Sequence, residues 1–341
     1  MRPTTKDLAK AAGVSLATVD RVLNERSGVR KKTVDAVNEA IDRIGFVRNL
    51  SAANLARQRI YRLAFVLPEE GDEFLGALRG NIDEAQRSFA LQDIAIECIT
   101  TPASDPYRTA QIISDLQGQG FDGVAVMAPS SPQVRDASLR LSHAGIKVVG
   151  FVSGQQSQGD IGFVGIDNRA AGATAARLLG RFTVDRTGSV LVITEAMQAQ
   201  DSVERRLGFD RVLGANFPNL VALPSLETHG RPDRTRTIIE NAFTYHRDIM
   251  AVYVMASEGR QALSHLAKME CDASRVVVAH ERTAFTEALL RDGTLDAVIA
   301  QSPGHLVRSA VRTLRARIDG NEPIASQERI RIEILIRENL V

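Results

Sequence analysis

The clearest string with the spacing of a chemical motif is glycine-rich and occupies residues 118–123. It reads Gly-Gln-Gly-Phe-Asp-Gly and matches the G-x-G-x-x-G pattern that binds dinucleotides. In a working motif the string follows a strand and opens a helix, whose N-terminus holds the pyrophosphate. Here it ends a helical segment at residues 110–117 and leads into an apolar run at 123–128. The context is reversed, so we interpret these glycines as a helix C-cap and turn.

Other enzymatic signatures are missing from the sequence. It has no P-loop, no nucleophile elbow and no Cys/His cluster with zinc spacing. Its two cysteines, Cys98 and Cys271, are far apart, which favours a reducing compartment over a disulfide framework. We therefore expect no catalytic residues, no metal and no cofactor. A polar start and the lack of an apolar run of about 20 residues predict a cytoplasmic protein without a membrane partner.

Charge is distributed unevenly along the 341 residues. Residues 1–62 hold 13 lysines and arginines against 6 aspartates and glutamates, a net charge of +7. Because the whole chain carries +1, the remainder carries −6. A basic N-terminal region on a mildly acidic body indicates that only the N-terminal region meets a polyanion, although basic clusters are also common on solvated helix faces.

The basic region has the pattern of three helices. Residues 4–12 form the first, with a threonine cap, and Gly13 allows the tight turn after it. Ser15 can cap the second helix, residues 16–23, whose apolar face carries Val19. The opposite face carries Leu16, Ala17, Asp20 and Arg21, and a third helix spans about residues 32–44. An exposed second helix that bears an arginine is typical of a helix-turn-helix.

The sequence of this region is specific. The strings KDLAKAAGVS at residues 6–15 and TVDRVLN at 18–24, followed by IGF at 44–46 and Asn49, resemble the start of the lac repressor family. The resemblance implies a recognition helix in the major groove, where Arg21 binds a guanine bidentately or a phosphate instead. Leu16 and Ala17 resemble the specificity positions. The candidate phosphate contacts are Thr5, Thr18, Asn24 and Arg30.

Two positions depart from the family. Asp20 replaces the usual serine, and its role stays open between accepting from a cytosine and restraining Arg21. Residues 49–57 match a short hinge helix that folds when two subunits sit on operator DNA. Leu55 there can wedge into the minor groove, unless the segment is only a linker. Arg48 stands where relatives have proline, which leaves the entry to the hinge less rigid.

The body has a different pattern. From residue 62 onward, short apolar runs alternate with helical stretches, which predicts parallel sheets covered by helices on both faces. The strings FDGVAV at 121–126, VGIDN at 164–168, RRLGF at 205–209 and DAVIAQ at 296–301 are similar to the type I periplasmic sugar-binding fold carried by this repressor family. The resemblance implies two lobes, three crossovers and a ligand cleft at the carboxyl ends of the strands.

The resemblance also implies ligand positions. They are rich in carboxylates and amides, with one guanidinium, which suits the hydroxyls of a sugar or polyol. Several have an alternative capping or surface role, Asp167 above all. The sequence has no tryptophan and lacks the usual Asn-Asp pair near residue 258, so a charged ligand is an alternative to a sugar. The candidate positions are Asp72, Phe74, Ser130, Asp167, Arg205, Glu258, Glu281 and Gln301, with Glu70 and Ser131 beside them.

These expectations define a domain plan: a helix-turn-helix domain at 1–47, a hinge at 48–60 and an effector domain at 61–341. The first lobe takes about 61–160 plus 297–320, and the second takes about 161–296 plus 321–341. We expect a homodimeric transcriptional repressor that binds a palindromic double-stranded operator. A small-molecule effector is expected to control this binding. The alternatives are a solute-binding transport component or a sugar-modifying enzyme with the same body fold.

Overall fold

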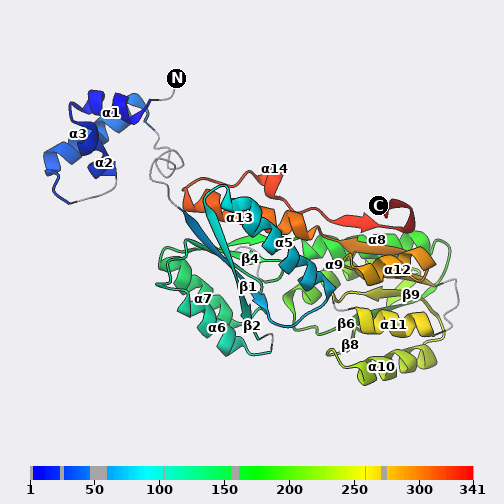
Figure 1. The fold of residues 1–341 in the computed structure, drawn as a ribbon. Coiled ribbons are helices and arrows are strands. Elements are labelled where there is room, and N and C mark those ends of the chain that lie inside the picture. The colour runs from blue at the N-terminus through cyan, green and yellow to red at the C-terminus, as the bar shows by residue number, and fades with distance from the viewer. Residues whose placement is uncertain are drawn as a thin grey trace. The chain divides into compact units, whose positions relative to one another are not determined.

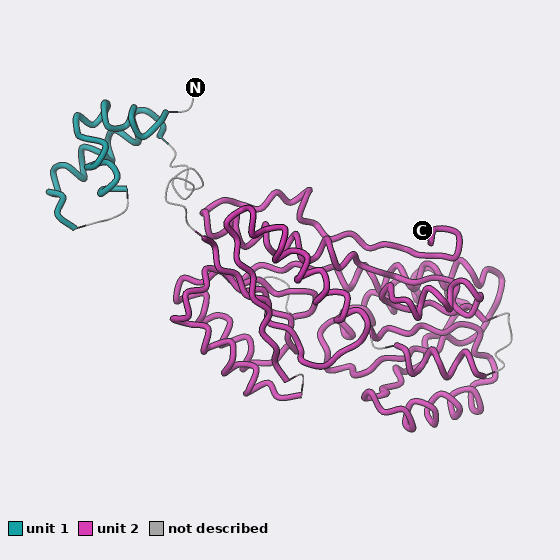
Figure 2. The backbone as a smooth tube through the Cα atoms, viewed as in Figure 1, with its two compact units in different colours: residues 1–59 teal, residues 60–341 magenta. Residues whose placement is uncertain are grey.

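In a computed structural model the chain forms two compact units, residues 1–59 and 60–341 (Figure 2). The structure describes residues 3–23, 27–46, 60–102, 104–154, 161–257, 259–269 and 275–340. Within these ranges no helix is long and apolar enough to cross a membrane. The two units are described separately below.

The described residues of the first unit form three helices, α1 Thr5–Ala12, α2 Leu16–Leu23 and α3 Lys31–Ile44. Thr4 and Asp7 form a capping box at the start of α1, and Gly13 ends it with a φ of +65°. Ser15 Oγ accepts a hydrogen bond from Thr18 N at 3.1 Å, so it caps α2. The buried apolar side chains of the three helices, with Phe46 after α3, form one small core: Leu8, Ala9, Val19, Val37, Ala40 and Phe46. The predicted helix-turn-helix arrangement is confirmed.

The first lobe of the body contains a parallel sheet in the order β2-β1-β3-β4-β5 (Figure 1). Alternate residues of β1 face opposite sides, because side chains in a strand alternate. Leu63 and Phe65 pack with α5 and α13, whereas Ala64 and Val66 pack with α6 and α7. The elements are β1 Tyr61–Pro68, α5 Glu73–Ala90, β2 Ile94–Thr101, α6 Pro106–Asp115, β3 Gly123–Val126, α7 Pro132–His143, β4 Lys147–Phe151, β5 Gly162–Val164 and α13 Pro303–Ile318.

The second lobe contains a sheet in the order β12-β11-β10-β9-β6-β7, and β8 also pairs with β6. All pairs are parallel except β11 with β12. Its elements are α8 Asn168–Phe182, β6 Gly188–Thr194, α9 Gln200–Asn216, β7 Leu220–Ala222, β8 Leu226–Glu227, α10 Pro232–Tyr245, β9 Ile249–Val254, α11 Arg260–Lys268, β10 Val276–His280, α12 Ala284–Asp292, β11 Ala297–Ala300 and β12 Glu333–Leu335. The short α14 Ala325–Glu328 and the 3-10 helix Arg337–Asn339 flank β12.

Helices α8 and α9 cover one face of this second sheet and approach each other at two glycines. A Cβ at Gly172 would lie 1.8 Å from the backbone oxygen of Arg205, and one at Gly208 would lie 1.9 Å from that of Arg169. Only glycine allows two backbones to come this close. This close packing fixes the position of α9, and α9 carries Arg205.

Two predicted lobe boundaries are wrong. Strand β5 pairs with β4, so residues 162–164 belong to the first lobe and not the second. Strand β11 pairs with β10 and β12, so residues 297–300 belong to the second lobe and not the first. Apolar runs of similar composition occur in both sheets, and only pairing reveals the sheet to which a strand belongs. The chain crosses between lobes three times: after β5, after β11 and between α14 and β12.

The glycine-rich string at 118–123 has the predicted reversed context. Helix α6 ends at Asp115, Gly118 and Gly120 adopt φ values of +84° and +82°, and β3 begins at Gly123. No helix N-terminus follows the string, so it lacks the part of the motif that would hold a pyrophosphate.

Candidate effector cleft and DNA-reading helix

A cleft of about 520 Å³ opens where strands of both sheets end. The carboxyl ends of parallel strands share one edge of a sheet, so the residues that follow the strands come together there. The polar and charged side chains that line it come from the ends of β1, β4, β6, β8, β9, β10 and β11 and from α9 and α11: Glu70, Asp72, Ser153, Thr194, Glu195, Asp201, Arg205, Thr228, Ser257, Gln261, Glu281 and Gln301. Phe74 of α5 also lines it.

Arg205 lies at the base of this cleft and is only 3% exposed. Its Nε donates to Asn168 Oδ1 at 2.9 Å, and its Nη1 donates to the backbone oxygen of Met255 at 2.6 Å. Its Nη2 lies 3.7 Å from Glu281 Oε1, and Gln301 Nε2 donates to the same oxygen at 3.0 Å. The guanidinium is thus held by three elements, and it pairs with a buried carboxylate.

Glu281 is 1% exposed and adopts a φ of +65°. Its backbone nitrogen donates to Ile299 O at 2.9 Å, and its backbone oxygen accepts from Thr286 Oγ1 at 2.9 Å, which holds the strained conformation. Val152, which also lines the cleft, has a φ of +61°. Such strain in residues other than glycine costs about 1–3 kcal/mol and clusters at ligand sites.

Burial raises the pKa of Glu281 to about 7, although the Arg205 charge and the Gln301 hydrogen bond act in the opposite direction. Behind it, Tyr253 Oη and His280 Nε2 lie 2.7 Å apart. Burial, and then the charge of Arg205, lower the pKa of His280 well below its usual value. His280 is therefore neutral, and Arg205 carries the only positive charge beside Glu281 among these buried residues.

Other carboxylates gather around this buried group. Burial raises the pKa of Asp72, whose Oδ1 accepts from Leu75 N at 2.9 Å and so caps α5. Burial also raises the pKa of Glu195, and the negative charges of Asp72 and Asp201 add to that increase. These carboxylates lie close enough to repel one another, so the cleft has a negative field.

The structure brings most of the predicted ligand positions together. Asp72, Phe74, Arg205, Glu281 and Gln301 all line the cleft, and so does Glu70. The side chains that sequence reasoning missed include Glu195 and Asp201. Glu195 directly follows β6, so the rule that ligands bind at strand ends was a sufficient signal for it.

Two of the predicted positions that the structure describes, Asp167 and Ser130, do not line this cleft. Asp167 is exposed and caps α8, since its Oδ1 accepts from Ala170 N at 3.0 Å. Ser130 lines a separate cavity of about 70 Å³ with Ser131, which caps α7 by accepting from Val134 N at 3.2 Å. A short polar side chain after a strand either caps the next helix or faces a ligand, and Asp167 and Ser131 cap the next helix. Glu258 lies outside the described residues.

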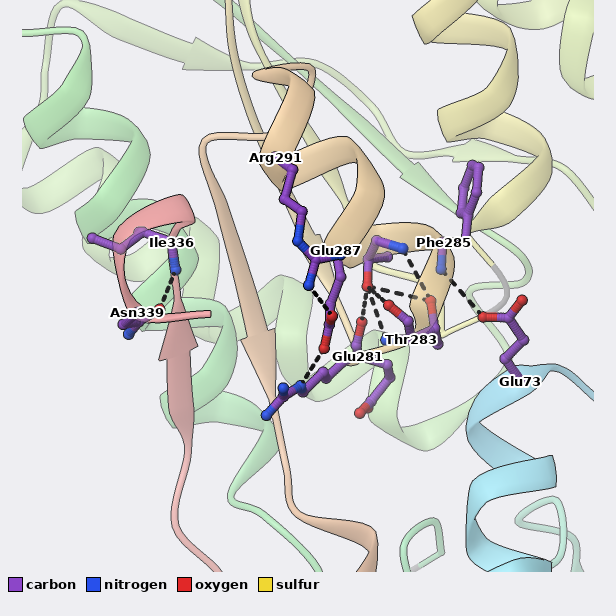
Figure 3. Close-up of polar contacts among 10 residues, drawn as sticks. Glu73, Glu281, Thr283, Phe285, Glu287, Arg291, Ile336 and Asn339 are labelled. Atoms are coloured by element: carbon purple, nitrogen blue, oxygen red, sulfur yellow. Dashed lines mark hydrogen bonds and ion pairs between the residues drawn. The ribbon is translucent and has the colours of Figure 1, made fainter. Parts of the chain in front are cut away.

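A contact beside the cleft joins the two lobes (Figure 3). Glu73, at the start of α5, forms an ion pair with Arg260 of α11 and accepts from Phe285 N of α12 at 3.4 Å. The Arg260 guanidinium lies 4.5 Å from the centre of the Phe285 ring. The neighbours Asp72 and Gly259 both line the cleft, so this bridge is next to the site where a ligand would bind.

In the N-terminal unit, α2 presents one face to solvent that mixes apolar and charged side chains. Leu16 is 47% exposed, and Ala17, Asp20 and Arg21 are also exposed, whereas Val19 is fully buried. Thr18 is half-buried, with its Oγ1 2.9 Å from Ser15 Oγ. The predicted division of this helix into two faces is confirmed.

Thr5 and Arg30 are exposed at the first residue of α1 and at the N-cap of α3. Helix N-termini are common positions for phosphate contacts. The predictions for Asn24, Arg48 and Leu55 concern residues outside the described ranges.

Models of known protein families match both units of the chain. Residues 4–49 match the model of the lacI family of bacterial regulatory proteins, and residues 63–322 match a periplasmic binding protein domain. The chain therefore belongs to the periplasmic binding protein domain family through its body, and its N-terminal region is a helix-turn-helix domain of the lacI type.

Among curated relatives, catabolite control protein A of Staphylococcus epidermidis is 27% identical over 204 residues, or 60% of this chain and 59% of the relative. The HTH-type transcriptional regulator DegA of Bacillus subtilis is 32% identical over 124 residues, or 36% of each. These matches thus span between about a third and three fifths of the relatives' lengths.

Solved structures share the fold of the body. A solute-binding protein from Burkholderia graminis, in complex with D-arabinose, has a TM-score of 0.73 at 23% identity and covers 83% of this chain and 97% of its own. A LacI transcriptional regulator from Bacteroides fragilis has a TM-score of 0.69 at 19% identity and covers 82% and 98%. At these identities the likeness shows the fold alone.

Proposed function

We propose that this protein is a cytoplasmic, homodimeric transcriptional repressor whose affinity for a palindromic operator is controlled by a small polar ligand in the interlobe cleft. The observation that carries the proposal is that one chain combines an exposed helix-turn-helix face with an enclosed polar cleft. A solute-binding protein or a sugar-modifying enzyme of the same body fold does not require a helix-turn-helix. The relatives named as regulators support the same choice.

The N-terminal unit reads DNA through α2. Arg21 forms two parallel hydrogen bonds with a guanine in the major groove, and Leu16 and Ala17 contact thymine methyl groups or fill space. Thr5, Thr18, Asn24 and Arg30 contact phosphates and set the register. Leu55 of each subunit inserts into the minor groove, where paired hinge segments bend the operator.

The body converts ligand binding into a change of hinge pairing. A ligand that contacts residues of both lobes binds a closed state more tightly than an open one, and it shifts the population toward closure. The ion pair of Glu73 with Arg260 joins the same two lobes and favours the same state. Hydroxyl-rich ligands such as sugars or polyols suit the carboxylates and amide of the cleft.

Two exposed arginines of the N-terminal unit provide a matched test on a selected operator. Arg21→Ala should cost about 1–3 kcal/mol and relax specificity at one base pair. Arg30→Ala should weaken binding equally across sequences and lower the salt slope by about one. The measurement is fluorescence anisotropy against operators with single base changes. A protein that selects no palindrome from random DNA would contradict the proposal, as would equal effects of both variants on specificity.

A further inference from the structure

The charge inside the cleft is unbalanced. Among the described residues that line it, five are carboxylates and one is a cation: Glu70, Asp72, Glu195, Asp201 and Glu281 against Arg205. The lining residues contain one aromatic side chain, Phe74, to stack on a sugar ring. The cleft therefore has an excess of negative charge over what a neutral polyhydroxy ligand requires.

Arg205 does not remove this excess. Its Nε and Nη1 are occupied by Asn168 and by the backbone of Met255, and its Nη2 faces Glu281. The guanidinium thus neutralises one carboxylate at the base of the cleft. Asp72, Glu195 and Asp201 line the same cleft. Burial raises the pKa of Glu195, and the negative charges of Asp72 and Asp201 raise it further, so Glu195 lies close enough to both to be repelled by them.

Buried acceptor atoms point to the same imbalance. Asp72 Oδ2, Glu281 Oε2 and Gln301 Oε1 are buried and have no hydrogen-bond partner among the described residues. All three are acceptors, and Glu281 and Gln301 are only 1% and 2% exposed. Leaving such groups unsatisfied is costly, so the ligand must bring donors to them. An ammonium group supplies three donors, no acceptor and a compensating charge.

We infer that the effector carries a positively charged amino group on a polar, hydroxyl-bearing framework, in the manner of an amino sugar or an amino-substituted polyol. Its ammonium group lies among Asp72, Glu195 and Asp201, and its hydroxyls reach Glu281 and Gln301. This inference rests on the proposed function, because it assigns the ligand of the same regulatory cleft. It excludes sugar phosphates and sugar acids, whose charge is repelled by the four carboxylates that Arg205 does not neutralise.

The test uses probes that share one ring framework and carry a positive, a neutral or a negative group on it. D-Glucosamine is compared with D-glucose, N-acetyl-D-glucosamine and D-glucuronate, and an amino-inositol with inositol, within a broader library sorted into cationic, neutral and anionic compounds. Thermal shift of the full-length protein identifies hits, and calorimetry gives their affinities. We expect the hits to be cationic, with the amine at least about tenfold tighter than its neutral counterpart, and weaker binding as salt rises. A library without a cationic hit overturns the inference.

Variants locate the amine. Asp201→Asn and Glu195→Gln keep shape and remove one charge, so each should lower the affinity for the amine at least about tenfold and leave that for a neutral analogue within about twofold. Each should also raise the melting temperature of the ligand-free protein, because it relieves repulsion inside the cleft. The control is Asp136→Asn, an exposed carboxylate of α7 paired with Arg140, which should change neither quantity. Equal losses for the amine and its neutral analogue overturn the inference.

The outcome for the inference can be distinguished from that for the proposed function. A neutral compound that stabilises the protein and shifts its operator affinity leaves the regulator intact and overturns only the amine. An amine that binds in the cleft without shifting operator affinity supports the assignment and contradicts the ligand control. A divalent cation that stabilises the protein, and loses its effect with Asp201→Asn, contradicts the organic amine in favour of a metal ion.

Discussion

Glu73 and Arg260 form an ion pair that joins α5 of the first lobe to α11 of the second. Both side chains are about half exposed, so the pair contributes at most about 1 kcal/mol to stability. Its importance lies in its position, because it can form only when the two lobes come together beside the cleft. A weak bond of this kind can adjust an equilibrium between open and closed states that are close in free energy.

Glu73→Gln should therefore weaken ligand binding several-fold, mainly through faster dissociation, while the melting temperature of the ligand-free protein hardly changes. Stopped-flow measurement of ligand release would check the prediction. Glu97→Gln is the matched control, because it breaks the similarly exposed pair of Glu97 with Arg62 within the first lobe. Equal effects of the two variants on release would show that the bridge has no role in closure.

Removal of Arg205 should destabilise the body strongly. Arg205→Ala leaves Glu281 buried without its cation, and breaking a buried pair in this way costs about 3–5 kcal/mol. Arg205→Lys should also fail, because one ammonium cannot reproduce bonds to Asn168, Met255 and Glu281 at once. Thermal unfolding of the two variants would measure the effect. The double variant Arg205→Met with Glu281→Gln should regain part of the loss, and its failure to do so would locate the cost elsewhere.

The ionisation of Glu281 predicts a pH dependence of stability. Its pKa of about 7 in the folded protein exceeds the usual glutamate value of 4.5, so the folded state holds the proton more tightly. The resulting stability is fully present below about pH 4.5 and is lost as the pH rises through about 7. The charged groups that act on it are Arg205, Asp72 and Asp201, while the adjacent His280 is neutral.

Glu281→Gln isolates this contribution, since glutamine mimics the protonated acid and does not titrate. The free energy of unfolding of the natural protein, relative to the variant, should fall between about pH 5 and about pH 8. Urea denaturation across this range would measure the difference. A difference that is flat, or that rises with pH, would show that Glu281 is ionised in the folded protein throughout.

The contact between α8 and α9 predicts opposite effects for two glycines of α9. Gly208→Ala would place a Cβ 1.9 Å from the backbone oxygen of Arg169, so it should destabilise by at least about 1–3 kcal/mol and displace Arg205. Gly214→Ala meets nothing within 4 Å, so it should stabilise by up to about 1 kcal/mol through helix propensity. Thermal unfolding and ligand affinity would test both. A harmless Gly208→Ala would mean that the helices can separate without loss.

Much of this protein can be predicted from the sequence. The helix boundaries of the N-terminal unit follow from Thr4, Gly13 and Ser15, because caps act within a few residues of the chain. Arg205, Glu281 and Gln301 were predicted through family resemblance, and they do meet in one cleft. The reversed setting of the glycine-rich string was predictable for the same reason as the caps, since order along the chain determines it.

Asp167 and Asp201 show where such prediction stops. Asp167 comes just before Asn168, and Asp201 comes four residues before Arg205. Nevertheless Asp167 caps α8 in solvent, whereas Asp201 lines the cleft. Sequence spacing cannot separate these outcomes, because the direction of a short side chain depends on where its helix packs. Lobe membership of β5 and β11 was likewise undecidable, since hydrogen bonding between distant segments selects the sheet.

The sequence by itself determined the order of elements, the exposed face of α2 and the identity of the charged residues. Only the tertiary structure decided that five carboxylates, from three strand ends and one helix, line a single cleft with one arginine. The physical reason is that periodicity and capping act over a few residues, whereas electrostatic repulsion and burial depend on distances that folding creates. The positive charge expected of the ligand follows from this electrostatic repulsion and burial.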